Sequence, residues 1–482
     1  MKTNSHAQET MLGGSAVAAL VACWMLAAGP ALTQSDGDLF AHIAAGRAIL
    51  TTRRLPAVNP AWASDVLLAV VHARSGLTGI TIAVALLAGA THALSFATMR
   101  RYGVTLRVAL PAALTGATLA TSHWLARPHA FTLAALAVLL WLLTSPRGRR
   151  RWLIVPLFAV WVNLHGGWIF GWLVLAVWTA GDLLDVRSRV PRTPYQPHGE
   201  RVWRDVATFA VASAATLATP FGIALYKTIW RTLFDASLRA TVDEYRPPSW
   251  DVPVDALFLA TVVIGAVTML WPLRTSPPRR AASFAMGLAT AAALSAGRHI
   301  ALYALVAWPL LVVHIASHVA TREAHGPTMP LRVHRGRGAI AASVAAVSVL
   351  LMAWRTAPTT VSAVRFPVAA VAAMQREHAA TPVFTTWAWS GYLPYAWADH
   401  RAWFDPLRFS PAELRALGHV LDVRANWRDE LDRLGVRTIL LPRGSPLARA
   451  LAADAAWSSV YRDNTAVVFR RRAPSVAIDH PD

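Results

Sequence analysis

Lysine, cysteine and charged side chains of every kind are scarce in this chain of 482 residues. Only 15% of the residues are charged, whereas a soluble protein carries about a quarter. Lys2 and Lys227 are the only lysines, so arginine supplies almost all of the formal net charge of +20. Cys23 is the only cysteine, which excludes an intrachain disulfide bond and a thiolate metal site.

Three sequence motifs of common enzyme classes are also missing. The chain has no phosphate-binding loop of the Walker type, no Gly-x-Gly-x-x-Gly dinucleotide fingerprint and no Gly-x-Ser-x-Gly nucleophile elbow. The net charge alone would fit a nucleic-acid-binding protein. The arginines, however, lie in short clusters between apolar runs, which is the pattern of cytoplasmic loops in a membrane protein. We therefore expect no nucleic-acid partner.

Apolar residues make up 55% of the chain and lie in long runs. The first run covers about 11–32, longer than the roughly 20 residues needed to cross a bilayer, and we interpret it as an uncleaved transmembrane helix. Ten further runs cover about 76–99, 107–123, 129–145, 152–166, 168–184, 203–223, 254–273, 281–297, 299–318 and 338–354. The sequence predicts a polytopic α-helical membrane protein with about 11 transmembrane helices. The stretch 65–73 is too short to cross and is expected to be interfacial or re-entrant.

Arginine is distributed unequally between the loops that join these runs. The even-numbered loops hold 19 arginines, namely Arg100, Arg101, Arg107, Arg147, Arg149, Arg150, Arg151, Arg187, Arg189, Arg192, Arg201, Arg204, Arg274, Arg279, Arg280, Arg322, Arg332, Arg335 and Arg337. An excess of arginine marks the cytoplasmic side of a membrane. The N-terminus is therefore predicted to be cytoplasmic and the C-terminal tail to lie outside the cytoplasm.

The tail differs in composition from the rest and divides the chain into a membrane domain, 1–354, and a soluble domain, 355–482. Strands are predicted at 383–387, 438–441, 458–461 and 466–469, and helices at about 363–377, 411–421, 425–434 and 446–454. Alternating strands and helices indicate a small α/β domain outside the cytoplasm.

The odd-numbered loops, on the predicted outer side, carry acids, imidazoles and arginines. Asp38 and His42 are four residues apart, so one helical turn places them on the same face. An ionisable residue at membrane depth costs about 2.5–3.5 kcal/mol unless it faces a cavity or a partner. The groups expected to share one outward-facing cavity, a candidate active site, are Asp36, Asp38, Arg127, His129, His165, Arg298 and His299.

Each of these motifs also has a structural interpretation. The alternatives are a helix cap for Asp36 and Asp38, contact with lipid headgroups for Arg127, links between helices for Asn163 and His165, a plain loop charge for Arg298 and His299, and a simple ion pair for Glu244. A single shared site explains these residues more simply than the structural interpretations do, because those would require a separate explanation for each of five outer turns. A divalent cation such as Mg²⁺ or Mn²⁺ fits the carboxylates and imidazoles, although no tight metal-binding spacing is present.

An acidic motif directly after the first transmembrane helix, together with a soluble outer domain at the C-terminus, resembles the C-type glycosyltransferase superfamily. The chain is similar, more closely, to a large group of bacterial polytopic membrane proteins with that layout. The stretches that carry the resemblance are Asp36-Gly37-Asp38 with His42 and Gly46, Arg127-Pro128-His129, Trp161-x-Asn163-x-His165-Gly166-Gly167, Arg298-His299, Trp389-Ser390-Gly391-Tyr392-Leu393, Asp405-Pro406-x-Arg408 and Tyr461-Arg462-Asp463. The chain departs from the pattern at Asn59, where related chains often repeat an acidic residue.

The resemblance implies a multi-pass enzyme of the bacterial inner membrane that transfers a sugar, with inversion, from a polyprenyl phosphate to a glycan, lipid or protein outside the cytoplasm. The implied roles are Asp36 or Asp38 as the catalytic base, Arg127, Arg298 and His299 as donor-phosphate ligands, His42, His129, Asn163, His165 and Glu244 as polar support, and Trp389, Tyr392, Asp405 and Arg408 as acceptor-binding residues. The aromatic residues of the tail have the domain core as their structural alternative. Two other functions stay open: a transporter or flippase for a lipid-linked molecule, and a non-catalytic scaffold in envelope assembly.

Overall fold

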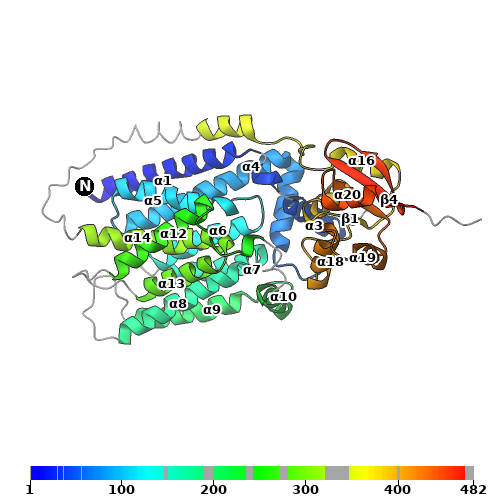
Figure 1. The fold of residues 1–482 in the computed structure, drawn as a ribbon. Helices are drawn as coiled ribbons and strands as arrows, with labels where there is room; N and C mark the ends of the chain where they lie inside the picture. The colour runs from blue at the N-terminus through cyan, green and yellow to red at the C-terminus, as the bar shows by residue number, and fades with distance from the viewer. Residues whose placement is uncertain are drawn as a thin grey trace, which may run out of the picture.

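The computed structural model describes residues 2–29, 31–35, 37–55, 57–145, 150–187, 199–234, 243–270, 280–320, 347–398 and 402–472. Over these residues the chain is a long bundle of helices with a smaller α/β domain at one end (Figure 1). Helix α1 begins at the opposite end of the bundle. One end of the bundle therefore carries the α/β domain, and the other end carries the start of α1.

Mostly apolar helices make up the bundle. They are α1 (Lys2–Ala27), α4 (Trp62–Arg101), α5 (Leu106–Leu119), α6 (His129–Leu143), α7 (Ile154–Leu164), α8 (Trp168–Arg187), α9 (Gly199–Ala215), α12 (Pro253–Leu270), α13 (Arg280–Ser295), α14 (Ile300–Ala320) and a helix at Val347–Thr356. Every apolar run of the sequence overlaps one of them, the last run being described only from residue 347. Four described helices are long and apolar enough to cross a bilayer, and five shorter ones are also apolar.

Helix α4 explains the short stretch expected to be interfacial. It is one helical segment of 40 residues with non-helical backbone at Gly76, where φ is 61° and ψ is −159°. Only glycine adopts this conformation without strain. The break falls where the predicted spanning run begins, so the stretch 65–73 is the first arm of a bent helix and carries the buried Asp65.

The bundle end remote from the α/β domain holds arginines in ion pairs. Arg151 contacts Asp205 and lies 3.8 Å from Asp182, and the three side chains are 5%, 5% and 0% exposed. We call these three residues the inner cluster. They join η2 (Arg151–Leu153) to the end of α8 and the start of α9. Their burial among helix ends makes them a link between these elements.

The C-terminal domain is built on a four-stranded sheet of order β1-β2-β4-β3. Strand β1 (Val383–Thr385) is parallel to β2 (Thr438–Pro442), whereas β4 (Ala466–Arg471) is antiparallel to both β2 and β3 (Trp457–Arg462). Helices α16 (Val368–Arg376), α18 (Pro411–Leu421), α19 (Trp427–Arg433) and α20 (Pro446–Ala452) surround it. These elements coincide with the predicted strands and helices, apart from shifts of a few residues at their ends.

A helix that the sequence did not predict, α17 (Trp387–Ala396), packs the domain on α3 (Asp38–Thr52) at the end of the bundle. The backbones nearly touch: a Cβ at Gly37 would lie 1.7 Å from the Ala388 carbonyl oxygen, and one at Gly391 would lie 2.3 Å from the Gly37 carbonyl oxygen. Gln34, 1% exposed, accepts a hydrogen bond from the Ser362 amide at 2.7 Å. Glycine at 37 and 391 is thus what lets the two domains share one packed core.

Candidate active site

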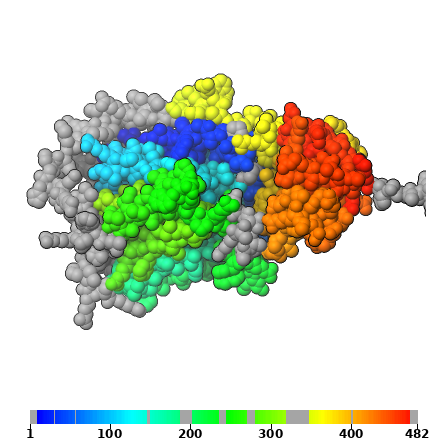
Figure 2. Space-filling view, in the orientation of Figure 1, coloured from blue at the N-terminus to red at the C-terminus, as the bar shows by residue number. Residues whose placement is uncertain are grey.

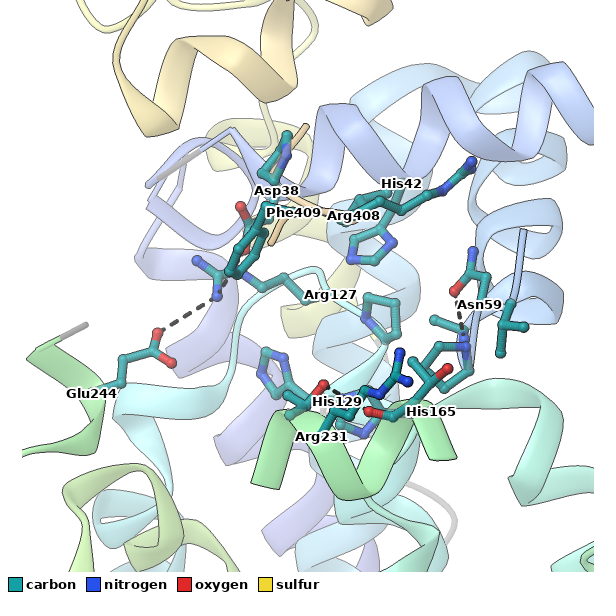
Figure 3. Close-up of a pocket in the computed structure, with 18 of the residues that line it drawn as sticks. Asp38, His42, Asn59, Arg127, His129, His165, Arg231, Glu244, Arg408 and Phe409 are labelled. Carbon is teal, nitrogen blue, oxygen red and sulfur yellow. Dashed lines mark hydrogen bonds and ion pairs between the residues drawn. The ribbon is translucent and has the colours of Figure 1, made fainter. Parts of the chain in front are cut away.

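A cavity of about 1060 Å³ lies between the end of the bundle and the C-terminal domain (Figure 3). Its lining residues are Asp38, His42, Ala57, Val58, Asn59, Pro60, Ala61, Ser122, His123, Leu125, Arg127, Pro128, His129, His165, Thr228, Arg231, Thr232, Phe234, Glu244, Arg298, Pro406, Leu407, Arg408, Phe409, Ser410, Pro411 and Glu413. Eight separate segments of the described chain therefore meet at one space.

A chain of ion pairs crosses one wall of the cavity. Arg127 Nη1 lies 3.2 Å from Asp38 Oδ2 and 3.5 Å from Glu244 Oε1, and Arg298 Nη1 lies 4.0 Å from Glu244 Oε2. We call these four residues the outer cluster. Their side chains are 18–38% exposed. Two arginines are thus held by carboxylates without being closed off from the cavity.

Neighbouring aromatic rings fix the ends of the outer cluster. The Trp387 indole donates a hydrogen bond of 3.3 Å to Asp38 Oδ1, so α17 of the C-terminal domain contacts the acidic loop directly. The Arg298 guanidinium carbon lies 4.5 Å from the centre of the Tyr245 ring. Stacking of this kind holds a guanidinium plane while leaving its N–H groups available to an anion.

Three histidines of the cavity wall, His123, His129 and His165, are uncharged donors and acceptors. Burial, with Arg298 and Arg127 nearby, lowers the pKa of His123 to about 3. Burial, again with Arg298, lowers the pKa of His165 to about 3. The His165 Nδ1 accepts hydrogen bonds from the Gly167 amide at 3.1 Å and the Thr132 hydroxyl at 2.9 Å, and His129 Nε2 donates to the His123 carbonyl. Arginine therefore supplies the positive charge of this cavity.

His42 has a different partner. Its Nδ1 lies 2.7 Å from Oδ1 of Asp65, whose side chain is fully buried. Asn59 donates a hydrogen bond of 2.7 Å to the other oxygen of Asp65. A Cβ at Gly46 would lie 2.0 Å from the Asp65 carbonyl oxygen, so glycine lets α3 and α4 approach closely enough to form this pair.

Asn163 and His299, both predicted as site groups, lie outside the cavity lining. Asn163 accepts a hydrogen bond of 2.8 Å from the Trp62 indole and donates to the Ala159 and Ala218 carbonyls, which makes it a link between helices. His299 Nδ1 lies 3.0 Å from the Ala292 carbonyl oxygen in the turn between α13 and α14. In the structure Asn163 thus joins helices, and Arg298 lines the cavity while His299 does not.

Three of the four residues predicted to bind the acceptor lie outside the cavity lining. Trp389 and Tyr392 are 5% and 4% exposed, because α17 turns them into the contact with the membrane domain. Burial raises the pKa of Tyr392 to about 12. Asp405 caps its own turn by accepting from the Leu407 amide at 2.9 Å and does not line the cavity. Arg408 does line it.

Asp36 lies outside the described residues. Among the residues that are described, no group of three or more histidine, cysteine or acidic side chains is placed to hold a metal ion.

Sequence reasoning missed several cavity residues. Arg231 and Thr228 come from α10 (Ile223–Phe234), a short helix in the stretch between the predicted runs 203–223 and 254–273, where the sequence predicted no helix. The signal was present, because Lys227 and Arg231 alternate with apolar residues at helical spacing. The loop 406–411 gave no signal beyond Arg408.

Comparisons with known proteins find fold neighbours only. No protein-family model and no curated protein matches the chain. Among solved structures, the oligosaccharyltransferase of Archaeoglobus fulgidus in its apo form aligns with a TM-score of 0.45 and 11% identity, covering 89% of this chain and 69% of that one. The same enzyme tethered to an acceptor peptide aligns with a TM-score of 0.49 and 11% identity, covering 95% of this chain and 74% of that one.

A third neighbour is ArnT from Cupriavidus metallidurans bound to undecaprenyl phosphate, with a TM-score of 0.46 and 17% identity over 95% of this chain and 97% of that one. These proteins have the fold of the C-type glycosyltransferase superfamily, which the sequence resembles. Every TM-score is below 0.5, so the function below rests on the residues of this chain.

Proposed function

We propose that the protein is a membrane glycosyltransferase that transfers a sugar from a polyprenyl phosphate to an acceptor outside the cytoplasm. The observation that carries the proposal is the outer cluster: Arg127 and Arg298 lie on the wall of a large cavity at the boundary between the membrane helices and the soluble domain. In this proposal a lipid-linked donor would reach the cavity from the membrane side and a water-soluble acceptor from the side of the soluble domain.

The arginines suit a phosphate ligand. A guanidinium presents paired N–H groups that match phosphate oxygens, and it stabilises the negative charge that develops on a leaving phosphate. Arg127 and Arg298 both contact Glu244, one of the more exposed members of the cluster at 38%. An arriving phosphate would replace the Glu244 carboxylate on the two guanidiniums, so the donor is recognised by exchange of one anion for another.

Helix α10 supports entry of a lipid-linked donor. Its apolar side chains Ile223, Trp230 and Leu233 are 68%, 65% and 44% exposed, while Arg231 lines the cavity. An amphipathic helix with this pattern lies in the membrane interface with its apolar face in lipid. Figure 1 shows α10 at the bundle end beside the C-terminal domain, so a polyprenyl chain in the bilayer would reach the cavity past this helix.

The C-terminal domain would contribute the acceptor side. The loop 406–411 and Glu413 at the start of α18 line the cavity opposite the helix bundle, and Figure 2 shows the domain seated over that end of the molecule. Arg408 is the predicted acceptor-binding residue that lies at this position.

In the reaction, the acceptor oxygen attacks the anomeric carbon, the bond to the phosphate oxygen breaks, and the configuration inverts. The base predicted from the sequence is a carboxylate of the first outer loop, and Asp38 is the described one that lines the cavity. With this function go about 11 membrane crossings, a cytoplasmic N-terminus and a C-terminal domain outside a bacterial inner membrane, as the arginine distribution predicts.

The test uses the full-length protein in nanodiscs. Undecaprenyl phosphate is titrated first, and binding is expected for the wild type and lost in an Arg127→Gln, Arg298→Gln double variant. Labelled undecaprenyl-phosphate hexoses and pentoses are then supplied with envelope fractions from a strain lacking the gene. Label is expected to move to an acceptor; binding without any transfer, combined with movement of the lipid between leaflets, would instead support a flippase.

A further inference from the structure

We infer that His42, positioned by Asp65, is the base that takes the proton from the acceptor hydroxyl. The inference rests on the proposed glycosyl transfer and assigns a residue for which the sequence predicted only polar support. It starts from a pair that links two helices: His42 on α3 and Asp65 on the first arm of α4, joined at 2.7 Å.

The geometry fixes which nitrogen of His42 is available. Because the Asp65 carboxylate accepts at Oδ1, the imidazole carries its proton on Nδ1 and leaves Nε2 with a free lone pair. Among the described residues Nε2 has no hydrogen-bond partner, and His42 lines the cavity. Figure 3 shows the ring facing the same space as Arg127 and His165.

Asp65 is held as a positioning residue rather than as a base. Its side chain is fully buried, and its two oxygens are taken by His42 Nδ1 and by the Asn59 amide. Asn59 is in turn fixed by the Ala61 amide, which donates to its Oδ1 at 2.8 Å. A buried carboxylate with both oxygens directed in this way orients an imidazole and stabilises the imidazolium that forms on proton uptake. Asn59, the departure from the acidic pattern of related chains, supplies one of these contacts.

Two other candidates in the cavity, Asp38 and His165, are less suited to accept a proton. Asp38 is already paired with the Arg127 guanidinium at 3.2 Å and accepts from the Trp387 indole at 3.3 Å, and ion pairing makes a carboxylate a weaker base. His165 uses its Nδ1 lone pair for the Gly167 amide and the Thr132 hydroxyl. Of the cavity histidines in the described chain, His42 is the one with a carboxylate behind it.

The step balances without any further reactant. The acceptor O–H proton moves to His42 Nε2 as the oxygen forms its bond to the anomeric carbon. The bond from that carbon to the donor phosphate oxygen breaks, and its electron pair stays on the polyprenyl phosphate, next to Arg127 and Arg298. The imidazolium, paired with Asp65, then returns its proton to solvent. The acceptor reaction centre is therefore a hydroxyl group beside the α3 wall.

The experiment compares His42→Ala, His42→Gln and Asp65→Asn with the wild type in the transfer assay, with undecaprenyl phosphate binding measured for each. Loss of a general base is expected to lower kcat by about 10²–10⁴-fold in both His42 variants while donor binding is retained. Asp65→Asn is expected to lower kcat by about 10²-fold with KM little changed. Added imidazole should restore part of the rate of His42→Ala and none of that of Asp38→Asn.

Controls separate a lost base from a lost fold. His419→Ala, on α18 and outside the cavity lining, should transfer at the wild-type rate. His42→Gln keeps a donor for Asp65, so a thermal transition like that of the wild type would show that its lower rate is not unfolding. Wild-type protein that neither binds nor transfers would overturn the proposed function. A transferring wild type whose His42→Ala variant keeps kcat within about threefold would overturn the base assignment alone.

Discussion

The inner and outer clusters are made of the same side chains, arginine paired with carboxylates, at opposite ends of the helix bundle. In the inner cluster, Arg151 and its two aspartates are at most 5% exposed. In the outer cluster, Arg127 is 18% and Glu244 is 38% exposed, and both line a cavity of about 1060 Å³. The two clusters have the same kinds of side chain, but of the two only the outer cluster borders this cavity.

The difference in exposure has a chemical consequence. A charge whose surroundings are filled by protein has no room to exchange its partner, and removing that partner leaves an uncompensated buried ion. A guanidinium that borders a cavity can give up a carboxylate and accept a phosphate. The inner cluster should therefore matter for folding and the outer cluster for the reaction.

Replacing Arg151 with Met should have the largest effect on stability. The change leaves Asp182 and Asp205 buried without their guanidinium, and removal of one member of a buried ion pair costs about 3–5 kcal/mol. Unfolding in mixed detergent micelles would measure the loss. Transfer per folded molecule should remain at the wild-type level.

The matched control removes the whole inner cluster. Arg151→Met combined with Asp182→Leu and Asp205→Leu removes all three charges of the cluster, so most of the lost stability should return, as it does when buried ion pairs are replaced by apolar groups. A triple variant as unstable as the single one would contradict the view that the cluster is only a structural link.

Replacing Arg127 with Gln should have the largest effect on the reaction. In the proposed reaction Arg127 stabilises the leaving phosphate, and loss of one such group is expected to lower kcat by about 10²–10³-fold. Because the side chain is partly exposed and borders empty space, stability should change by no more than about 1 kcal/mol. Arg54→Gln, an exposed arginine outside the cavity lining, is the control. If Arg127→Gln unfolds the protein as Arg151→Met does, the two clusters do not differ in the way proposed.

Replacing Gly391 with Ala should weaken the contact that covers the outer cluster. The added Cβ would lie 2.3 Å from the Gly37 carbonyl oxygen, and overpacking of this kind costs about 1–3 kcal/mol. Hydrogen exchange should rise in α3 and α17 and stay unchanged around Arg151. Gly418→Ala on α18, where a Cβ meets nothing within 4 Å, should show neither effect.

Much of the architecture could be predicted because it depends on local patterns. Apolar runs mark the helices, and the predicted strands lie within a few residues of β1 to β4. Asp38 and His42 were expected on one face because they are one helical turn apart, and both line the cavity. Arg127 and Arg298 were expected beside them because each lies in an outer turn.

What could not be predicted depends on contacts between distant segments. Asp65 lay in a stretch assigned to the membrane interface, and nothing local showed that its partner is His42, 23 residues earlier. Trp389 and Tyr392 fitted either a sugar-binding surface or a core, because the same aromatic residues at the same spacing occur in both. The close approach of Gly391 to Gly37 decides for the core, and that approach is a property of the folded chain.

Arg408 provides the finest test of the comparison, because it borders the same cavity from the C-terminal domain. Its side chain is exposed, so Arg408→Ala should leave stability unchanged and raise KM for the acceptor by up to about tenfold, since a rim arginine contributes to binding more than to the transition state. Undecaprenyl phosphate binding should be unaffected, which separates this arginine from Arg127. Arg415→Ala, exposed on α18 and outside the cavity lining, is the control. A fall in kcat with KM constant would move Arg408 from the acceptor side to the donor phosphate and extend the outer cluster into the soluble domain.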